Sequence, residues 1–201
     1  MKLYSSPTSP FARMVQVVLL ETGLQDDVEI VPVATSALSS NPDLIAVNPV
    51  GRIPTLVRPD GPAMFDSRVI CRFLDARAKS GLYPDSRIWE VLTLEALGHG
   101  ITESALAMAY ERKLRPAEIR WDLWMDKQWE KAARGLGSLE TRWMSHLNGP
   151  LNIGQIVVAC SLSYIDFRHG DRGWRRGHES LAAWHAEFEA RPSMQTTRPA
   201  E

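Results

Sequence analysis

The sequence predicts an α/β unit near residues 1–78 followed by an all-helical unit near residues 87–201. Three observations support this fold class. Residues 1–78 alternate short apolar runs with helical stripes, residues 79–86 (KSGLYPDS) interrupt the pattern with turn-forming residues, and no convincing strand follows. A chain of 201 residues is long enough to form two small domains.

The first helix has a well-marked start. Met1 to Tyr4 can form a short strand, and Pro10 suits the first helical position, where its missing N–H costs nothing. Ser9 is therefore the predicted N-cap. Apolar residues then recur at the spacing of one helix face as far as a stop at Gly23, and they are Phe11, Met14, Val15, Val18 and Leu19.

The strands predict a small mixed sheet of four strands. Residues 28–33 (VEIVPV) form the second strand, which is parallel to the first because a crossover helix joins them. A long loop follows, and residues 53–65 (IPTLVRPDGPAMF) predict a hairpin that adds two antiparallel strands. Residues 66–78 (DSRVICRFLDARA) then predict a helix capped by Asp66 or Ser67.

The second unit contains four predicted helices. They cover about residues 87–114, 116–146, 152–168 and 180–190. Asn148, Gly149 and Pro150 end the second of these helices. Asn152 and Gln155 predict a capping box at the start of the third, because Asn can accept a helix amide and Gln can return the bond.

Composition excludes several classes of partner. The chain has 23 basic and 24 acidic side chains, so its net charge favours neither nucleic acid nor an anionic membrane. No apolar run is long enough to span a bilayer, and the first residues lack the apolar core of a signal peptide. We therefore expect a cytoplasmic protein. The two cysteines lie in apolar helical patterns and are expected to be buried structural thiols.

The segment YSSPTSPFAR (residues 4–13) gathers hydroxyl groups where a strand leads into a helix. A helix N-terminus carries free N–H groups and partial positive charge, so together with Ser9 it can hold an anion. The alternative is that Ser9 only caps the helix, which is a common role for Ser before Pro.

Three further features of the first unit can bind a ligand. Pro54 follows Ile53 at the start of the hairpin, and a cis bond between them would turn backbone groups of Ile53 outward, free to pair with a peptide-like molecule. Asp66 and Ser67 open the next helix, where they can bind polar groups or only cap it. Arg52 can hold a carboxylate, although a single Arg in a loop is often only solvated.

Together these motifs resemble the cytosolic glutathione transferases, in particular small bacterial members with a serine-type start. YSSPTSPFAR, NPVGRIPTL and DSRVICRFLD follow one another in the family's order and spacing, and LNIGQIVVACSLSYIDFR and RPSMQTTRP resemble motifs of its helical domain. The resemblance implies a thioredoxin-like N-terminal domain, an all-helical C-terminal domain, and a homodimer whose glutathione sites lie near the interface.

The resemblance also implies a role for each candidate residue. Ser9 takes the place of the family's residue that faces the glutathione sulfur, and Ile53 pairs through its backbone with the cysteinyl part. Asp66 and Ser67 bind the γ-glutamyl ammonium and carboxylate, and Arg52 meets the glycyl carboxylate. Glutathione is then the co-substrate of a transferase, and its thiolate attacks a small hydrophobic electrophile.

The sequence leaves alternatives at this site. Ser5, Ser6 or Thr8 could face the sulfur in place of Ser9. The reaction could be conjugation, or a glutathione-dependent isomerisation or dehalogenation. A non-catalytic regulatory or protein-binding member of the fold is a third possibility, although such members often lack the acid and hydroxyl that open the second helix here. The histidines show no spacing typical of metal ligands, so we expect no metal site.

Overall fold

A computed structural model describes residues 1–200, which fold into two compact units. The first unit contains Met1–Tyr83 together with residues 192–200, and the second contains Pro84–Arg191. The sequence-based division placed everything after residue 87 in the second unit. The structure differs because the short helix α9 (Pro192–Thr196) packs on α1 (Pro10–Glu21), so the first unit is discontinuous in sequence.

The first unit is built on a three-stranded sheet in the order β2-β1-β3. The central strand β1 (Lys2–Ser5) is parallel to β2 (Glu29–Pro32) and antiparallel to β3 (Thr55–Val57). Leu3 pairs with Leu56 across the antiparallel ladder, and both side chains are fully buried. As predicted, a parallel crossover and an antiparallel return combine into one small mixed sheet.

The predicted fourth strand is reduced to one bridge, so the expectation of four strands is wrong. Met64 and Leu56 exchange two backbone hydrogen bonds, at 2.8 and 2.9 Å. In an antiparallel ladder the next hydrogen-bonded positions lie two residues away on either side. Those positions hold Pro62 on one strand and Pro54 on the other, and proline has no N–H to donate.

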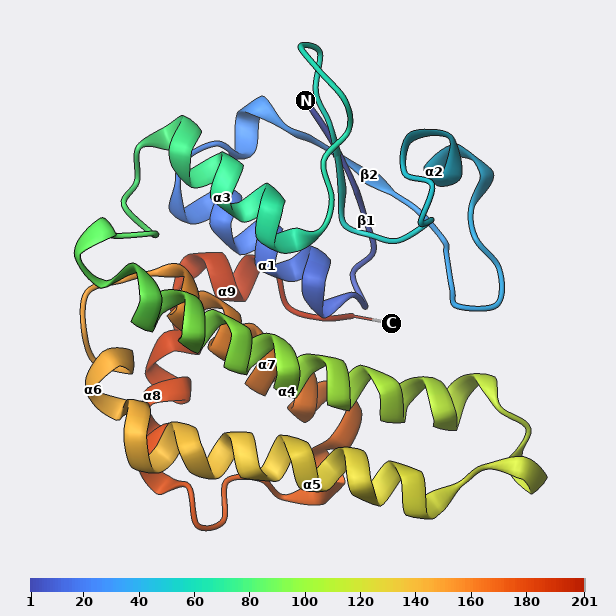
Figure 1. The fold of residues 1–201 in the computed structure, drawn as a ribbon, viewed down its shortest axis with the longest axis vertical. Helices are drawn as coiled ribbons and strands as arrows, with labels where there is room; N and C mark the ends of the chain where they lie inside the picture. The colour runs from blue at the N-terminus through green and yellow to red at the C-terminus, as the bar shows by residue number, and fades with distance from the viewer. Residues whose placement is uncertain (201) are drawn as a thin grey trace. The chain divides into compact units, whose positions relative to one another are not determined.

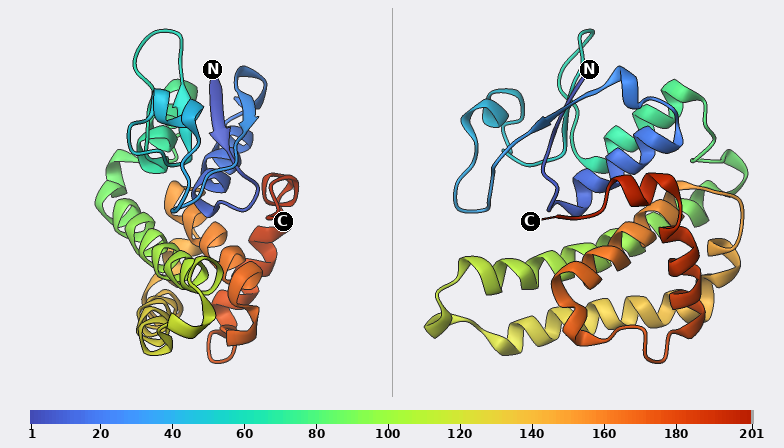
Figure 2. Two further views of the ribbon diagram at one scale, coloured as in Figure 1. Left: turned by 90° about the vertical axis from the view of Figure 1, so that its right-hand side faces the viewer. Right: turned by 180° about the vertical axis from the view of Figure 1, so that it is seen from behind.

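The helices of the first unit begin at side-chain caps. Ser9 caps α1 with Pro10 at the first helical position, and Asp66 caps α3 (Ser67–Ala78), which confirms both predicted starts. The expected loop contains an unpredicted helix, α2 (Pro42–Val47), although Asn41 as its cap and Pro at its first position are typical start signals. Figures 1 and 2 show α1 and α3 side by side on one side of the strands and α2 on the other.

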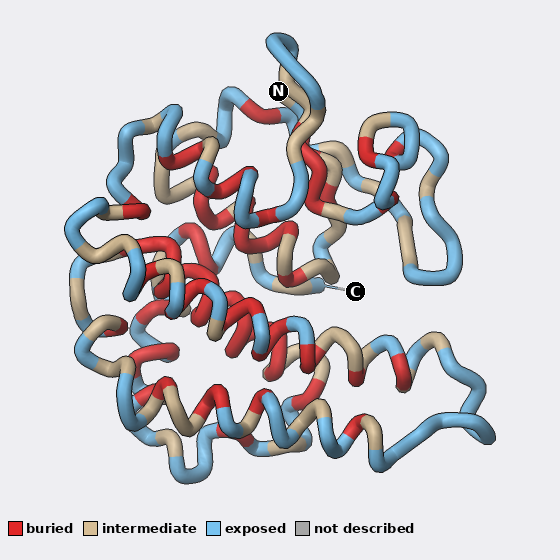
Figure 3. The backbone as a smooth tube through the Cα atoms, viewed as in Figure 1, coloured by how far each residue is buried: buried red, intermediate tan, exposed pale blue. Residues whose placement is uncertain are grey.

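The second unit is helical, and α7 (Ile153–His169) lies at its centre. Nearly every residue of α7 is buried, as the continuous red stretches in Figure 3 indicate. The predicted capping box is confirmed, since Gln155 N–H donates to Asn152 Oδ1 at 3.3 Å and Asn152 N–H donates to Gln155 Oε1 at 3.2 Å. The surrounding helices are α4 (Ile88–Leu114), α5 (Asp122–Ser138), α6 (Met144–Leu147) and α8 (Glu179–Glu189).

The single helix predicted over residues 116–146 is divided into several pieces. A 3₁₀ turn, η3 (Ala117–Ile119), precedes α5, and a π-helical turn, η4 (Leu139–Trp143), separates α5 from α6. Apolar spacing read as one continuous stripe over residues 116–146 did not locate this local change from α to π winding. Further short 3₁₀ turns are η1 (Gln25–Asp27), η2 (Asp85–Arg87) and η5 (Gly170–Arg172).

Gly98 permits the close packing of α4 on α7. A Cβ atom placed there would lie 2.8 Å from Val157 Cγ1 and 3.2 Å from the backbone nitrogen of Val158. We expect Gly98→Ala to lower the free energy of unfolding by about 1–3 kcal/mol, because the α7 backbone must move. Gly100→Ala is the matched control, since nothing lies within 4 Å of its added Cβ, and it should stabilise α4 by about 0.5–1 kcal/mol. Urea denaturation measures the free energy of unfolding of both variants. Equal changes in the two would contradict the explanation that Gly98 is needed for close packing of α4 on α7.

Glu140, on η4, caps α8 from outside that helix. Its carboxylate accepts the backbone N–H groups of Ser180 at 3.1 Å and Leu181 at 2.7 Å. Burial opposes ionisation, but these hydrogen bonds outweigh it and hold the pKa of Glu140 below its ordinary value of 4.5.

A lowered pKa makes the contribution of Glu140 depend on pH. The folded state binds the proton less readily than the unfolded state, so the stabilisation is complete above pH 4.5 and is lost as the pH falls through the folded-state value. We expect Glu140→Gln to lower the Tm at pH 7 and to approach the wild type in acid. A Tm difference that stays constant from pH 7 down to pH 3 would contradict this assignment.

Candidate functional site

The candidate residues of the first unit belong to segments that meet at the carboxyl end of β1. That strand ends at Ser5 and leads into the Ser9 helix start. The antiparallel partner β3 begins opposite Tyr4, so the preceding Pro54 lies at the same end. The bridge at Met64 returns the chain in that direction, which brings the Asp66 helix start to this edge as well.

Ser9 can cap the helix and donate a hydrogen bond at the same time. Its Oγ accepts the backbone N–H of Ala12 at 3.2 Å, which uses a lone pair of the hydroxyl. A serine hydroxyl also has one proton to donate. The two interpretations of Ser9 from the sequence are therefore compatible, because the cap leaves the O–H available to an anion at the helix N-terminus.

The neighbouring hydroxyls have partners within the protein. Ser5 is 1% exposed, and its Oγ accepts from Gln16 Nε2 at 2.7 Å. The hydroxyls of Ser6 and Thr8 bond each other at 3.1 Å. Burial disfavours Ser5, and Ser9 differs from Ser6 and Thr8 in lying at the N-cap of α1, next to the free N–H groups of the helix start.

The loop before β3 is held from inside by Asn48, which sequence analysis did not single out. Its side chain is fully buried and donates to Arg52 O at 3.0 Å and to Thr55 Oγ1 at 2.9 Å. The Ile53–Pro54 peptide is cis, the conformation that the family resemblance implies. Asn48 is the first residue of the motif NPVGRIPTL. Nothing in the spacing of this motif shows whether the Asn side chain is buried and hydrogen-bonded across the loop or lies exposed in a turn.

The start of α3 presents one exposed and one buried candidate. Asp66 is exposed, and its Oδ1 accepts the N–H of Arg68 at 3.1 Å. Ser67 is only 2% exposed and occupies the first helical position, where its N–H points out of the helix end. Arg52 is exposed, so its guanidinium can move to meet a carboxylate.

The large apolar and aromatic side chains of the second unit differ in burial. Met108 is fully buried and belongs to the core, whereas Tyr110 and Trp121 are exposed. His99 is also buried, 4.0 Å from Glu95 Oε1. A separate cavity of about 500 Å³ is lined by Arg112, Arg120, Asp122, Met125, Asp126 and Arg172, a set that the sequence gave no reason to group.

Two further features concern the whole described chain. Within residues 1–200, no helix combines the length and the apolar character needed to cross a membrane. In the same residues, His, Cys, Asp and Glu side chains do not gather in groups of three that could hold a metal ion.

A small mixed sheet with capped helix starts at one edge, joined to a helical unit, defines a two-domain protein with a thioredoxin-like first domain. Two family models match this chain: the N-terminal domain of glutathione S-transferases over residues 8–77, and the C-terminal domain over residues 122–187. The chain belongs to the glutathione transferase family. The thioredoxin-like and helical domains predicted from the sequence are therefore confirmed, with three strands in the sheet.

Relatives cover the full length of the chain. A solved glutathione transferase family member from Pseudomonas fluorescens, with bound glutathione, is 40% identical with a TM-score of 0.97, over 100% of this chain and 99% of that one. A glutathione S-transferase from Methylobacillus flagellatus, also with glutathione, is 31% identical with a TM-score of 0.86, over 99% of each chain. The uncharacterized GST-like protein YibF of Escherichia coli is 29% identical, over 99% of this chain and 98% of its own.

Proposed function

We propose that this protein is a glutathione transferase that stabilises the thiolate of bound glutathione and directs it at a small electrophile. The observation that carries the proposal is the Ser9 hydroxyl, which caps α1 through a lone pair and keeps its proton for an anion at the helix N-terminus. The glutathione bound to the Pseudomonas fluorescens and Methylobacillus flagellatus relatives supports the choice of ligand.

Each candidate residue has a proposed role. Ser9 donates to the sulfur, and Ile53, before cis-Pro54, pairs through its backbone with the cysteinyl part. Asp66 binds the γ-glutamyl ammonium, and Ser67 binds the γ-glutamyl carboxylate through its hydroxyl and N–H. Arg52 meets the glycyl carboxylate. These roles are supported by the topology of the first unit, because the segments that carry the five residues all lead to the carboxyl end of β1.

The Ser9 hydrogen bond and the helix N-terminus can together supply the energy needed to stabilise the thiolate. A free thiol has a pKa near 8.5, so lowering it by about two units requires roughly 2.7 kcal/mol of preferential thiolate binding. A charge-assisted hydrogen bond contributes about 1.5–3 kcal/mol, and a helix N-terminus about 0.3–1 kcal/mol. The thiolate then attacks a carbon that carries a leaving group such as halide, so that a C–S bond forms as the carbon–halogen bond breaks.

We also propose that the active form is a homodimer in the cytoplasm. Phe65 and Val69, beside the start of α3, expose apolar side chains that a second copy would cover. Cys71 and Cys160 are buried and are not joined in a disulfide, which is compatible with a reducing compartment. Sedimentation velocity tests the dimer, and a monomer at micromolar concentration would overturn that part.

Calorimetric titration of the wild type with glutathione tests the function, together with a conjugation assay using an activated aryl halide. We expect saturable binding and turnover. The glutathione analogue with serine in place of cysteine should bind and give no product, because it lacks the nucleophile. Absence of glutathione binding would overturn the proposal. Binding without turnover of aryl halides, alkyl halides or isomerisable substrates would instead indicate a non-catalytic member of the fold.

A further inference from the structure

Arg13 is a charged residue within the buried face of α1, and it is only 3% exposed. Its neighbours Ala12 and Met14 are fully buried core residues. Removing a guanidinium from water is unfavourable unless its donors find partners in the protein. The partners of Arg13 therefore show what this charge stabilises.

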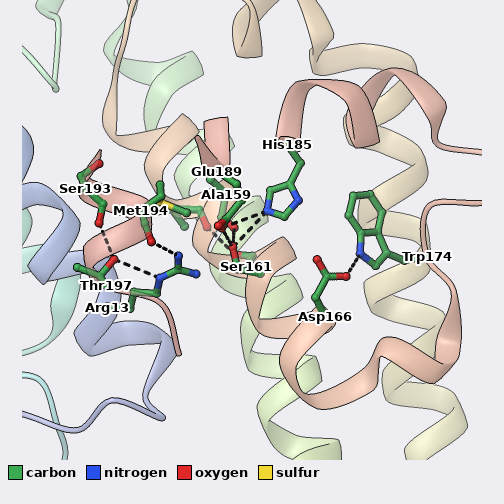
Figure 4. A network of polar contacts seen from close by, with 12 residues as sticks. Arg13, Ala159, Ser161, Asp166, Trp174, His185, Glu189, Ser193, Met194 and Thr197 are labelled. Atoms are coloured by element: carbon green, nitrogen blue, oxygen red, sulfur yellow. Dashed lines mark hydrogen bonds and ion pairs between the residues drawn. The ribbon is translucent and has the colours of Figure 1, made fainter. Parts of the chain in front are cut away.

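The guanidinium of Arg13 binds the α9 segment, which lies 181 residues further along the chain at Met194. Its Nη2 donates to Met194 O at 3.0 Å, and its Nε donates to Thr197 Oγ1 at 3.4 Å (Figure 4). Thr197 Oγ1 in turn donates to Ser193 O at 2.8 Å. One side chain of α1 thus holds both the backbone and a hydroxyl of the segment that completes the first unit.

A second contact fixes the same segment at the far end of α1. Ser193 Oγ donates to Glu21 Oε1, on the last residue of that helix. Arg13 and Glu21 are eight residues apart, which corresponds to about 12 Å along an α-helix. The segment is therefore held against α1 at two separated points, and the Arg13 contact is the one near the helix start.

The backbone of Arg13 connects this contact to Ser9. Arg13 N–H donates to Ser9 O at 3.0 Å, and Ala12 N–H donates to Ser9 Oγ at 3.2 Å. These two bonds form the turn that fixes both the backbone and the hydroxyl of Ser9. We propose that Arg13, held by residues 194 and 197, is a positioning residue for Ser9. Its importance for glutathione chemistry rests on the function proposed above.

The test compares Arg13→Met, which keeps the length but loses the charge and all donors, with Ser193→Ala, which removes only the far contact. Hydrogen exchange of the Ala12 amide reports on the Ser9 turn without any ligand. In Arg13→Met we expect this amide to exchange several-fold faster. The pH midpoint of kcat/KM for conjugation should rise by about 0.2–0.7 unit, the size of a helix-terminus contribution. Ser193→Ala should change neither quantity.

Milder variants keep the test decisive if Arg13→Met does not fold. Arg13→Lys retains the charge but places its donors on a single nitrogen, and Thr197→Val removes the Nε acceptor together with the Thr197 bond to Ser193 O, so both should give intermediate exchange rates. Folded variants that keep the wild-type exchange rate of Ala12 and the wild-type pH midpoint would overturn the inference, even if kcat falls. A wild type that does not use glutathione refutes the proposed function, while the exchange rate still decides whether Arg13 positions Ser9.

Discussion

Ser9→Ala is expected to lower kcat/KM for glutathione conjugation about 10- to 100-fold at neutral pH, which is the loss of one charge-assisted hydrogen bond to the thiolate. Glutathione should still bind, because its two ends are held elsewhere. Without the hydroxyl, the pKa of the bound thiol moves toward the ordinary value near 8.5. The defect should therefore shrink as the pH rises and the thiol ionises unaided, which a pH profile of kcat/KM measures.

The control Ser9→Gly separates this chemical effect from the loss of a helix cap, and Ser6→Ala and Thr8→Ala test the neighbouring hydroxyls. Ser9→Ala also removes the bond to the Ala12 amide, and losing an N-cap costs about 1 kcal/mol of stability. Ser9→Gly should be equally slow, although glycine at an N-cap costs only a few tenths of a kcal/mol. Ser6→Ala and Thr8→Ala should remain close to the wild type. A larger loss in Thr8→Ala than in Ser9→Ala would transfer the role to Thr8.

The double variant Asp66→Ala, Ser67→Ala is expected to lose glutathione affinity by about 100-fold or more, since a charge pair and two hydrogen bonds to the γ-glutamyl group would disappear. Arg52 and the Ile53 backbone remain and cannot replace a counter-charge for the ammonium. Calorimetric titration measures the change, and Tm measurements show whether the loss of the α3 cap has unfolded the chain.

Asp66→Asn is the matched control for that variant. Asn caps a helix about as well as Asp, so the bond to the Arg68 amide and the Tm should be retained. The negative charge is lost, and we expect glutathione affinity to fall about tenfold. If Asp66→Asn binds glutathione as the wild type does, Asp66 is only a cap, and the ammonium must be held by another group.

The sequence predicts those parts of the fold that depend on local chemistry. Ser9 before Pro10, Asp66 at the start of α3, and the Asn152 capping box are all side-chain contacts within three residues, and each is confirmed. Local signals also gather the candidate residues into one unit, although their roles stay predictions.

Features that depend on distant residues could not be predicted in this way. Pro54 and Pro62, which reduce the fourth strand to one bridge, can be read in the sequence. That they remove the next ladder hydrogen bonds follows only once the pairing of Met64 with Leu56 is known. Asn48 holds the loop before β3 only because the chain folds back over its side chain, where Arg52 and Thr55 accept its hydrogen bonds. Arg13 lies outside the apolar stripe that the sequence predicts for α1, and its partners lie in a segment that sequence patterning assigned to the other unit.

The discontinuous first unit also affects the order in which a newly made chain can fold. A ribosome synthesises residues 1–83 first, yet Met194 and Thr197 emerge only after the entire helical unit. Domains usually fold in the order in which they are synthesised. Here the first unit to emerge is the last to be completed, so nascent chains that stop before residue 192 should lack a finished glutathione site even though every residue proposed to touch glutathione is already present.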